Sequence, residues 1–72
     1  MGSFVTELGQ LVRQRRRANE MSQEELALLA GVGRRFVSEL ERGKASVRLE
    51  KVDLVLRVFG KRLGVVDRER NE

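Results

Sequence analysis

The sequence predicts an all-α domain in which four short helices are followed by one short strand. Apolar residues recur at intervals of three and four over residues 6–59, as on the inner faces of amphipathic helices. Gly31, Gly43 and Gly60 each follow one of these segments, and glycine is common where helices end. The period then changes, because residues 62–66 form a short apolar run that includes β-branched side chains.

Length and composition limit the kinds of function that this chain can perform. With 72 residues, it is expected to be a single domain with a small core. It has no Cys and no His, so the usual thiol nucleophile, general base and zinc ligands are missing. We therefore expect no enzyme activity, no metal and no cofactor. A net charge of +4 favours a polyanionic partner.

No apolar run approaches the roughly 20 residues needed to span a bilayer. No signal-peptide pattern opens the chain. We therefore expect a cytoplasmic protein with no membrane partner.

The first two helices have recognisable start signals. The first is expected from Thr6, as its N-cap, to about Asn19, after an arm of residues 1–5. Ser22 and Glu25 form a capping-box pattern before the second helix, which should end at a glycine.

The third and fourth helices follow after short connections. The third is expected from about Arg34 to Arg42, and the fourth from Leu49 to Phe59, with Ser46 as a candidate cap upstream. The apolar stripes of all four helices should meet in one core. The expected core residues are Leu8, Leu11, Val12, Leu26, Ala27, Ala30, Val37, Leu40, Leu49, Val52, Val55, Leu56 and Phe59.

Residues 22–43 have the pattern of a helix-turn-helix. Ala27 suits the point where two crossing helices touch, and Gly31 suits the tight turn. Val37, six residues further, supplies a β-branched core residue in the second of the two helices. The alternative is an unrelated small helical bundle.

The outward face of the third helix carries the candidate ligand-reading residues. Because Val37 is expected to face inward, the helical period turns Arg34, Arg35, Ser38 and Glu39 outward. In the major groove, Arg can donate to guanine, Glu can accept from cytosine, and Ser can pair with several base edges. We therefore predict that these four residues read bases. The alternative is a solvated face on which Arg35 and Glu39 form an i,i+4 pair.

The predicted strand has no partner within its own chain. Residues 61–66 contain its pairing segment, formed by Arg62, Leu63, Gly64, Val65 and Val66. An unpaired strand leaves its backbone donors and acceptors unsatisfied, and a second copy related by a two-fold axis would pair with it. We therefore expect a homodimer, with residues 67–72 as a charged tail.

Two overlapping stretches carry a family resemblance. The Cro/CI-type (XRE) family of bacterial and phage DNA-binding domains resembles the chain over SQEELALLAGVGRRFVSELERGK. The HipB-type antitoxin branch is similar to VSELERGKASVRLEKVDLVLRVFGKRLGVV, and in that branch two strands join across the dimer. The resemblance implies a four-helix, lambda-repressor-like domain with double-stranded DNA as its partner.

The same resemblance implies roles for residues around the third helix. Gln23 and Ser22, at the start of the second helix, match positions that approach backbone phosphate. Lys44 and Ser46, after the third helix, match a loop with the same role, and we place Arg42 with these phosphate contacts.

The resemblance also implies an internal ion pair, and the chain departs from the family pattern at two positions of the helix-turn-helix. Arg16 and Glu41 match a pair that joins the first helix to the third. Gly33 stands where the family often has a Ser or Thr cap. Phe36 is larger than usual, and it either plugs the core beside Leu40 or contacts a thymine methyl group.

Two further features each allow two interpretations. Leu28 and Leu29 indicate either an unusually buried second helix or a surface for a partner. Arg13, Arg15 and Arg17 are either solvated or in contact with phosphate or a partner.

Three hypotheses for function remain at this point. The first is a homodimeric, sequence-specific regulator, nucleoid-associated and repressing an inverted-repeat operator with half-sites about one helical turn apart. The second is an antitoxin that binds a toxin, commonly a kinase, as well as its own operator. The third is a protein-interaction adaptor that has lost DNA binding.

Overall fold

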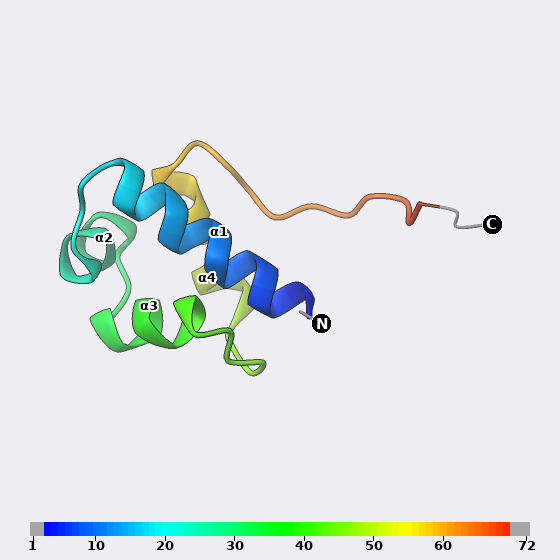
Figure 1. Cartoon of the computed structure of the whole chain (residues 1–72), viewed down its shortest axis with the longest axis horizontal. Coiled ribbons are helices and arrows are strands. Elements are labelled where there is room, and N and C mark those ends of the chain that lie inside the picture. Colours follow the sequence, from blue (N-terminus) through cyan, green and yellow to red (C-terminus); the bar gives the residue numbers. More distant parts are fainter. Residues whose placement is uncertain (1–2, 70–72) are drawn as a thin grey trace.

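Four helices make up the body of the molecule (Figure 1). The computed structural model describes residues 3–69; Met1, Gly2 and residues 70–72, on which parts of the predicted arm and tail fall, lie outside the described residues. The helices are α1 (Phe4–Ala18), α2 (Gln23–Ala30), α3 (Arg34–Glu41) and α4 (Leu49–Val58). The predicted all-α class with four helices is confirmed. None of the helices described is long and apolar enough to cross a membrane.

The N-cap of helix α1 lies three residues before the Thr6 cap that the sequence pattern indicates. The hydroxyl oxygen of Ser3 accepts a hydrogen bond from the amide of Thr6 at 3.2 Å, so Ser3 is the N-cap. The predicted Thr6 cap is therefore wrong, and Phe4 and Val5 are helical rather than part of an arm. Ser and Thr can both cap a helix, and here the earlier hydroxyl forms the bond.

The boundary between α2 and α3 follows the predicted signals. The side chain of Ser22 accepts from the Glu25 amide at 3.0 Å, and the Glu25 carboxylate accepts from the Ser22 amide at 2.7 Å. Gly31 ends α2 in the left-handed conformation, with φ of 77°. Because left-handed backbone favours glycine, Gly31 permits the tight turn that sets α3 across α2.

The start of α4 differs from the prediction in two respects. Arg48 is the N-cap residue and makes no side-chain capping bond, so the predicted role of Ser46 as a cap is wrong. Leu49 is exposed rather than part of the core, because it lies in the first turn of α4, at the edge of the body.

The core lies where the four helices meet. Helix α3 packs against α1 and α2, and α4 packs against α2. Each helix contributes at least one side chain with no exposed surface. The fully buried side chains are Val12, Leu26, Val37, Leu40, Val52 and Val55.

Close contact between α1 and α3 depends on a buried glycine. A Cβ atom placed on Gly9 would collide with the backbone carbonyl of Leu40 and crowd that of Glu41. Because Gly9 has no side chain, α1 can lie directly against the last turn of α3. This contact fixes the end of α3 relative to the rest of the domain.

The segment after α4 forms no strand within residues 3–69, so the strand predicted for residues 61–66 is not present in the single chain. The segment extends away from the helices (Figure 1). A strand needs a hydrogen-bonding neighbour, and the described part of the chain supplies none. One carboxylate oxygen of Asp53 accepts from the Leu63 amide at 3.0 Å and attaches the segment to α4. Beyond Leu63, Val65 is 100% exposed and Val66 is 87% exposed.

Candidate nucleic-acid interface

The outward face of α3 begins with two exposed arginines. Val37 and Leu40 are fully buried, which turns Arg34 and Arg35 into solvent. The side chain of Arg35 is 91% exposed. Ser38 lies on the same face and is half-buried. The helix therefore presents guanidinium donors at its N-terminal end, where helices of this kind enter a major groove.

Glu39, also on this face, is bound by two cations. One of its carboxylate oxygens, Oε2, lies 3.3 Å from Nε of Arg35 and 3.3 Å from Nζ of Lys44. Only 18% of the Glu39 side chain is exposed. Lys44 and then Arg35 lower the pKa of Glu39 below its usual 4.5, so the carboxylate is charged at neutral pH.

The turn that follows α3 places Lys44 beside Glu39. Gly43 is left-handed, with φ of 79°. Its amide donates to the carbonyl of Leu40 at 3.0 Å, and the amide of Lys44 donates to the carbonyl of Glu39 at 3.1 Å. These two bonds form a Schellman motif, which returns the chain toward the last turn of the helix. The lysine is thus held near the carboxylate by backbone geometry.

The end of α3 is fixed by a charged network with α1 and α2. Arg16 donates to both oxygens of Glu41, from Nε at 2.7 Å and from Nη2 at 2.9 Å. Nη1 of Arg16 donates to the carbonyl of Met21 at 2.8 Å, and Nε2 of Gln23 donates to Glu41 at 3.1 Å. Arg16 and Glu41 are 11% and 4% exposed, so the network is largely shielded from water.

The charge state of this network follows from its geometry. Burial raises the pKa of Glu41, but hydrogen bonds from Arg16 and Gln23 outweigh burial and bring the pKa below 4.5. The hydrogen bond to Glu41 raises the pKa of Arg16. Both groups are charged at neutral pH, and the bidentate pair gives α3 one fixed orientation.

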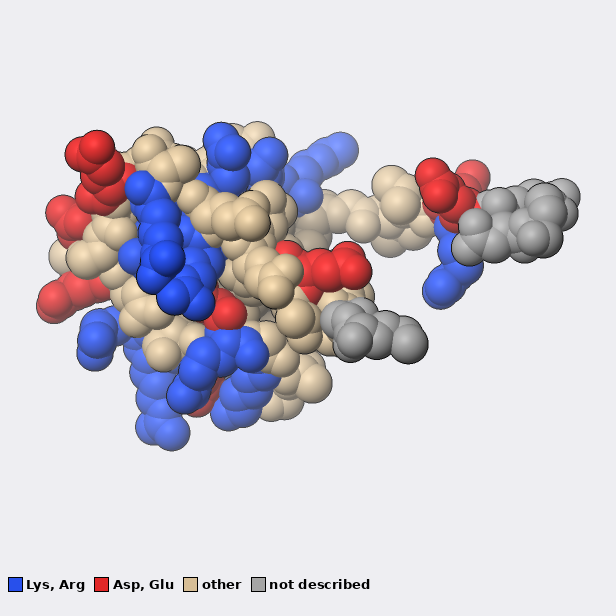
Figure 2. All heavy atoms as spheres, in the orientation of Figure 1, with Lys and Arg blue, Asp and Glu red and all other residues tan. Residues whose placement is uncertain are grey.

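Basic side chains gather over α1 and α3, and several acidic side chains lie over α2, with others near the start of α1 and on the C-terminal segment (Figure 2). Glu24 and Glu25 occupy the first turn of α2. The basic face fits a polyanion, because it combines several cations with a protruding helix. The exposed cations of α1, of α3 and of the turn after α3 include Arg13, Arg15, Arg17, Arg34, Arg35, Arg42 and Lys44.

Comparison with known proteins identifies the helix pair. A family model described as helix-turn-helix matches residues 12–66, which is most of the chain. The chain belongs to the XRE-type helix-turn-helix family. Such domains bind double-stranded DNA and regulate transcription, and membership points to a DNA-binding regulator rather than to an enzyme.

A relative in Sinorhizobium fredii (strain NBRC 101917 / NGR234) supports the same assignment. It is an uncharacterized HTH-type transcriptional regulator, y4mF, and it is 44% identical over 54 residues. The matched region covers 75% of this chain and 71% of the relative.

The helix-turn-helix places the predicted phosphate-contacting residues in different environments. The amide and hydroxyl oxygen of Ser22 are both engaged in the capping box, and the side-chain nitrogen of Gln23 is engaged with Glu41. Arg42 and Ser46 are exposed on either side of Lys44. Within residues 3–69, a phosphate could therefore contact the side chains of Arg42 and Ser46 without displacing a hydrogen bond or ion pair. Ser22 and Gln23 already have hydrogen-bond partners.

Two ambiguous sequence features are settled by packing in this helix-turn-helix. Phe36 is half-buried against the core, and Nζ of Lys51 lies 5.9 Å from the centre of its ring. This packing supports the interpretation of Phe36 as a plug. Leu28 and Leu29 are both exposed, so α2 is not unusually buried.

Two contacts of α4 residues were not predicted from the sequence: the hydrogen bond of Asp53 to the C-terminal segment and the contact of Lys51 with Phe36. Asp53 anchors the C-terminal segment, yet its position on α4 resembles that of any surface carboxylate. Lys51 lies over Phe36, and the i,i+3 and i,i+4 rules do not predict this contact because it joins two helices. A search for cations on α4 facing an aromatic residue of α3 could have suggested the second contact.

Proposed function

We propose that the protein is a homodimeric, sequence-specific repressor of an inverted-repeat operator. The observation that carries this proposal is the exposure of Arg34 and Arg35 at the start of α3. The end of this helix is fixed by Arg16 and Glu41. Rigid support beneath exposed guanidinium groups is what base recognition requires, since the donors must meet base edges in one geometry. Such a regulator would act in the cytoplasm, at the nucleoid.

The interface divides into base-reading and phosphate-binding residues. We assign base reading to Arg34, Arg35, Ser38 and Glu39. We assign phosphate binding to Ser22, Gln23, Arg42, Lys44 and Ser46. Exposure favours Arg34 and Arg35 as the principal readers, because Ser38 and Glu39 are half-buried.

Dimerisation would occur through residues 61–66, as in the HipB-type branch that the sequence resembles. The apolar side chains of Val65 and Val66 are exposed in the single chain, which favours a second copy as their cover. A groove of about 360 Å³, lined by Phe4, Leu49, Leu63, Gly64 and Val65, lies at this end of the molecule. To bind an inverted repeat, this strand pair must hold the two α3 helices about one DNA turn, roughly 34 Å, apart.

Selection of bound duplexes from a random pool tests the proposal. The expected result is enrichment of an inverted repeat. Arg35→Ala should lose discrimination at one base position per half-site, worth about 1–3 kcal/mol. Lys44→Ala should weaken binding to duplexes of every sequence, because it removes a phosphate contact and reads no base directly. Equal affinity of the wild type for every duplex would contradict sequence-specific regulation.

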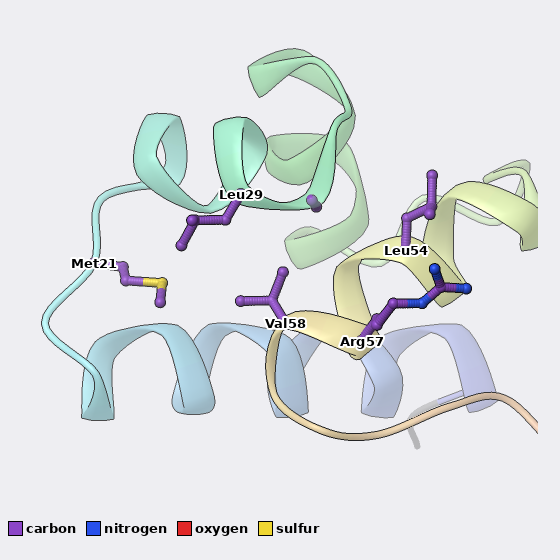
Figure 3. Close-up of a pocket in the computed structure, with 6 residues that line it drawn as sticks. Met21, Leu29, Leu54, Arg57 and Val58 are labelled. Atoms are coloured by element: carbon purple, nitrogen blue, oxygen red, sulfur yellow. The ribbon is translucent and has the colours of Figure 1, made fainter.

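An antitoxin that also binds a toxin is the second candidate, and an apolar groove favours it. The groove has a volume of about 470 Å³ and lies between α2, α4 and the loop before α2 (Figure 3). Met21, Leu29 and Val58 converge at one end, and Leu54 and Arg57 line the other. Purification from the native host tests this candidate. A protein without a bound partner, from a gene with no toxin gene beside it, would contradict the antitoxin role.

A further inference from the structure

We propose that Glu39 restrains non-specific DNA binding by neutralising Arg35 and Lys44, and that a cytosine of the correct site relieves this restraint. The inference rests on the proposed DNA binding and adds a second role to Glu39. In this role Glu39 lowers affinity for wrong sequences, in addition to contacting the right one.

The geometry of the three side chains carries the first step. A single oxygen of Glu39 lies 3.3 Å from both Nε of Arg35 and Nζ of Lys44. Arg35 belongs to the base-reading face, whereas Lys44 belongs to the loop assigned to phosphate. One carboxylate therefore binds a cation from each half of the proposed interface.

The positions of these groups along the backbone favour the contact. The Schellman motif after α3 fixes the backbone of Lys44 next to Glu39. Arg35 is one helical turn before Glu39, at the i,i+4 spacing at which oppositely charged side chains meet. By contrast, Arg34 and Arg42 make no ion pair within residues 3–69.

Non-specific binding depends on the number of phosphates that a protein neutralises. A cation already paired with a carboxylate neutralises a phosphate less well, because the carboxylate is repelled by the same phosphate. Glu39 therefore weakens the sequence-independent attraction of two cations. The penalty applies to every duplex.

A correct site can compensate for this penalty. The amino group at N4 of cytosine donates a hydrogen bond in the major groove, and a carboxylate is its natural acceptor. When Glu39 accepts a hydrogen bond from this group, the base replaces Arg35 and Lys44 as its hydrogen-bond donor, and the two cations are free to bind DNA. Duplexes without a cytosine at that position receive no such compensation, and the difference between right and wrong sites widens.

Glu39→Gln tests this role, with Glu50→Gln as the matched control. Glu50 is likewise a carboxylate in an ion pair, with Arg48 at 2.8 Å, and its substitution changes the net charge equally, although its side chain is more exposed, at 65% against 18% for Glu39. Binding to a selected duplex and to an unrelated duplex is measured over a range of salt concentrations. Melting curves establish that each variant is folded, and Glu39→Ala replaces Glu39→Gln if the latter is not.

The expected result has two parts. Glu39→Gln should raise affinity for the unrelated duplex by about threefold to tenfold and steepen its salt dependence by about one to two phosphate contacts. It should also lose the preference for cytosine at one position. In a Lys44→Gln background the gain should shrink, because one of the two released cations is absent.

Other outcomes overturn the inference. An unchanged affinity of Glu39→Gln for the unrelated duplex, or an equal gain from Glu50→Gln, would show that Glu39 has no restraining role. Neither of these two results changes the ability of the wild type to discriminate between duplexes, so the proposed function would stand without the restraining role of Glu39. A wild type that binds neither duplex would remove the proposed function and the inference together.

Discussion

Arg16 and Glu41 join α1 to the end of α3 through two hydrogen bonds of 2.7 and 2.9 Å. Both side chains are largely shielded from water, and Gln23 adds a bond from the start of α2. Three of the four helices therefore meet at one carboxylate. The orientation of the proposed recognition helix depends on this carboxylate and its partners.

Removal of the arginine should destabilise the fold strongly. In Arg16→Ala the carboxylate of Glu41 would remain buried without its main partner, at a cost of about 3 kcal/mol. Urea denaturation measures the change in the free energy of unfolding. Arg15→Ala is the matched control, because Arg15 lies exposed on the same helix and should change stability by less than about 0.5 kcal/mol. Equal losses in the two variants would contradict a structural role for the pair.

Acid should weaken the same network. The pKa of Glu41 in the folded protein lies below its usual 4.5, because Arg16 and Gln23 favour the charged form. The unfolded chain therefore takes up the proton first as the pH falls. The stabilisation is complete above pH 4.5 and is lost as the pH drops through the lower folded value.

Denaturation measured at several values between about pH 6 and pH 3 checks this dependence. Glu41→Gln should give a flatter dependence on pH, because the titrating group is gone. Glu50→Gln should keep the wild-type slope: the pKa of Glu50 is also lowered, but the group is exposed and solvent screens its pair. An unchanged slope in Glu41→Gln would show that other groups cause the acid sensitivity.

Local signals in the sequence predicted the helix-turn-helix well. The capping box of Ser22 and Glu25 and the left-handed Gly31 depend only on neighbours in the chain, and the structure has both. The start of α1 was missed because Ser and Thr are both residue types that cap helices, and residue type alone did not show which of Ser3 and Thr6 forms the bond. Leu49 fits the apolar period of α4, but it lies in the first turn, where the helix leaves the core.

The candidate site was predictable only in part. Helical periodicity alone places Arg34 and Arg35 outward once Val37 is inside. The pairing of Lys44 with Glu39 was not predicted, because it crosses the end of α3 and depends on the turn at Gly43. The strand was predicted from residue type, yet a strand requires a neighbour that a single chain does not contain.

The close contact at Gly9 gives a prediction about packing. Gly9→Ala would place a Cβ against the carbonyl of Leu40 and force α1 away from α3, which should destabilise the fold by about 1–3 kcal/mol. Thermal denaturation measures the loss. Gln10→Ala is the control, because Gln10 lies exposed on the same helix, next to Gly9 in the sequence. A Gly9→Ala protein as stable as the wild type would show that the helices can separate without cost.

The exposed valines at the end of the chain give a prediction about assembly. If two copies pair through residues 61–66, Val65→Asp places a charge in an apolar interface, and the dimer should dissociate to monomers in sedimentation equilibrium. The monomer should keep its helices, because Val65 is fully exposed in the single chain. It should also bind an inverted repeat no more tightly than one half-site, since the two α3 helices are no longer joined.

Arg68→Gln is the control for Val65→Asp, because it changes the net charge by the same amount at an exposed position outside the proposed strand. It should remain dimeric. If Val65→Asp is as dimeric as the wild type, or if the wild type is itself a monomer while bound to the whole operator, pairing through this segment is wrong. If Val65→Asp stays dimeric, pairing has to involve another surface, such as the groove between α2 and α4, and Leu29→Asp would dissociate the dimer in place of Val65→Asp.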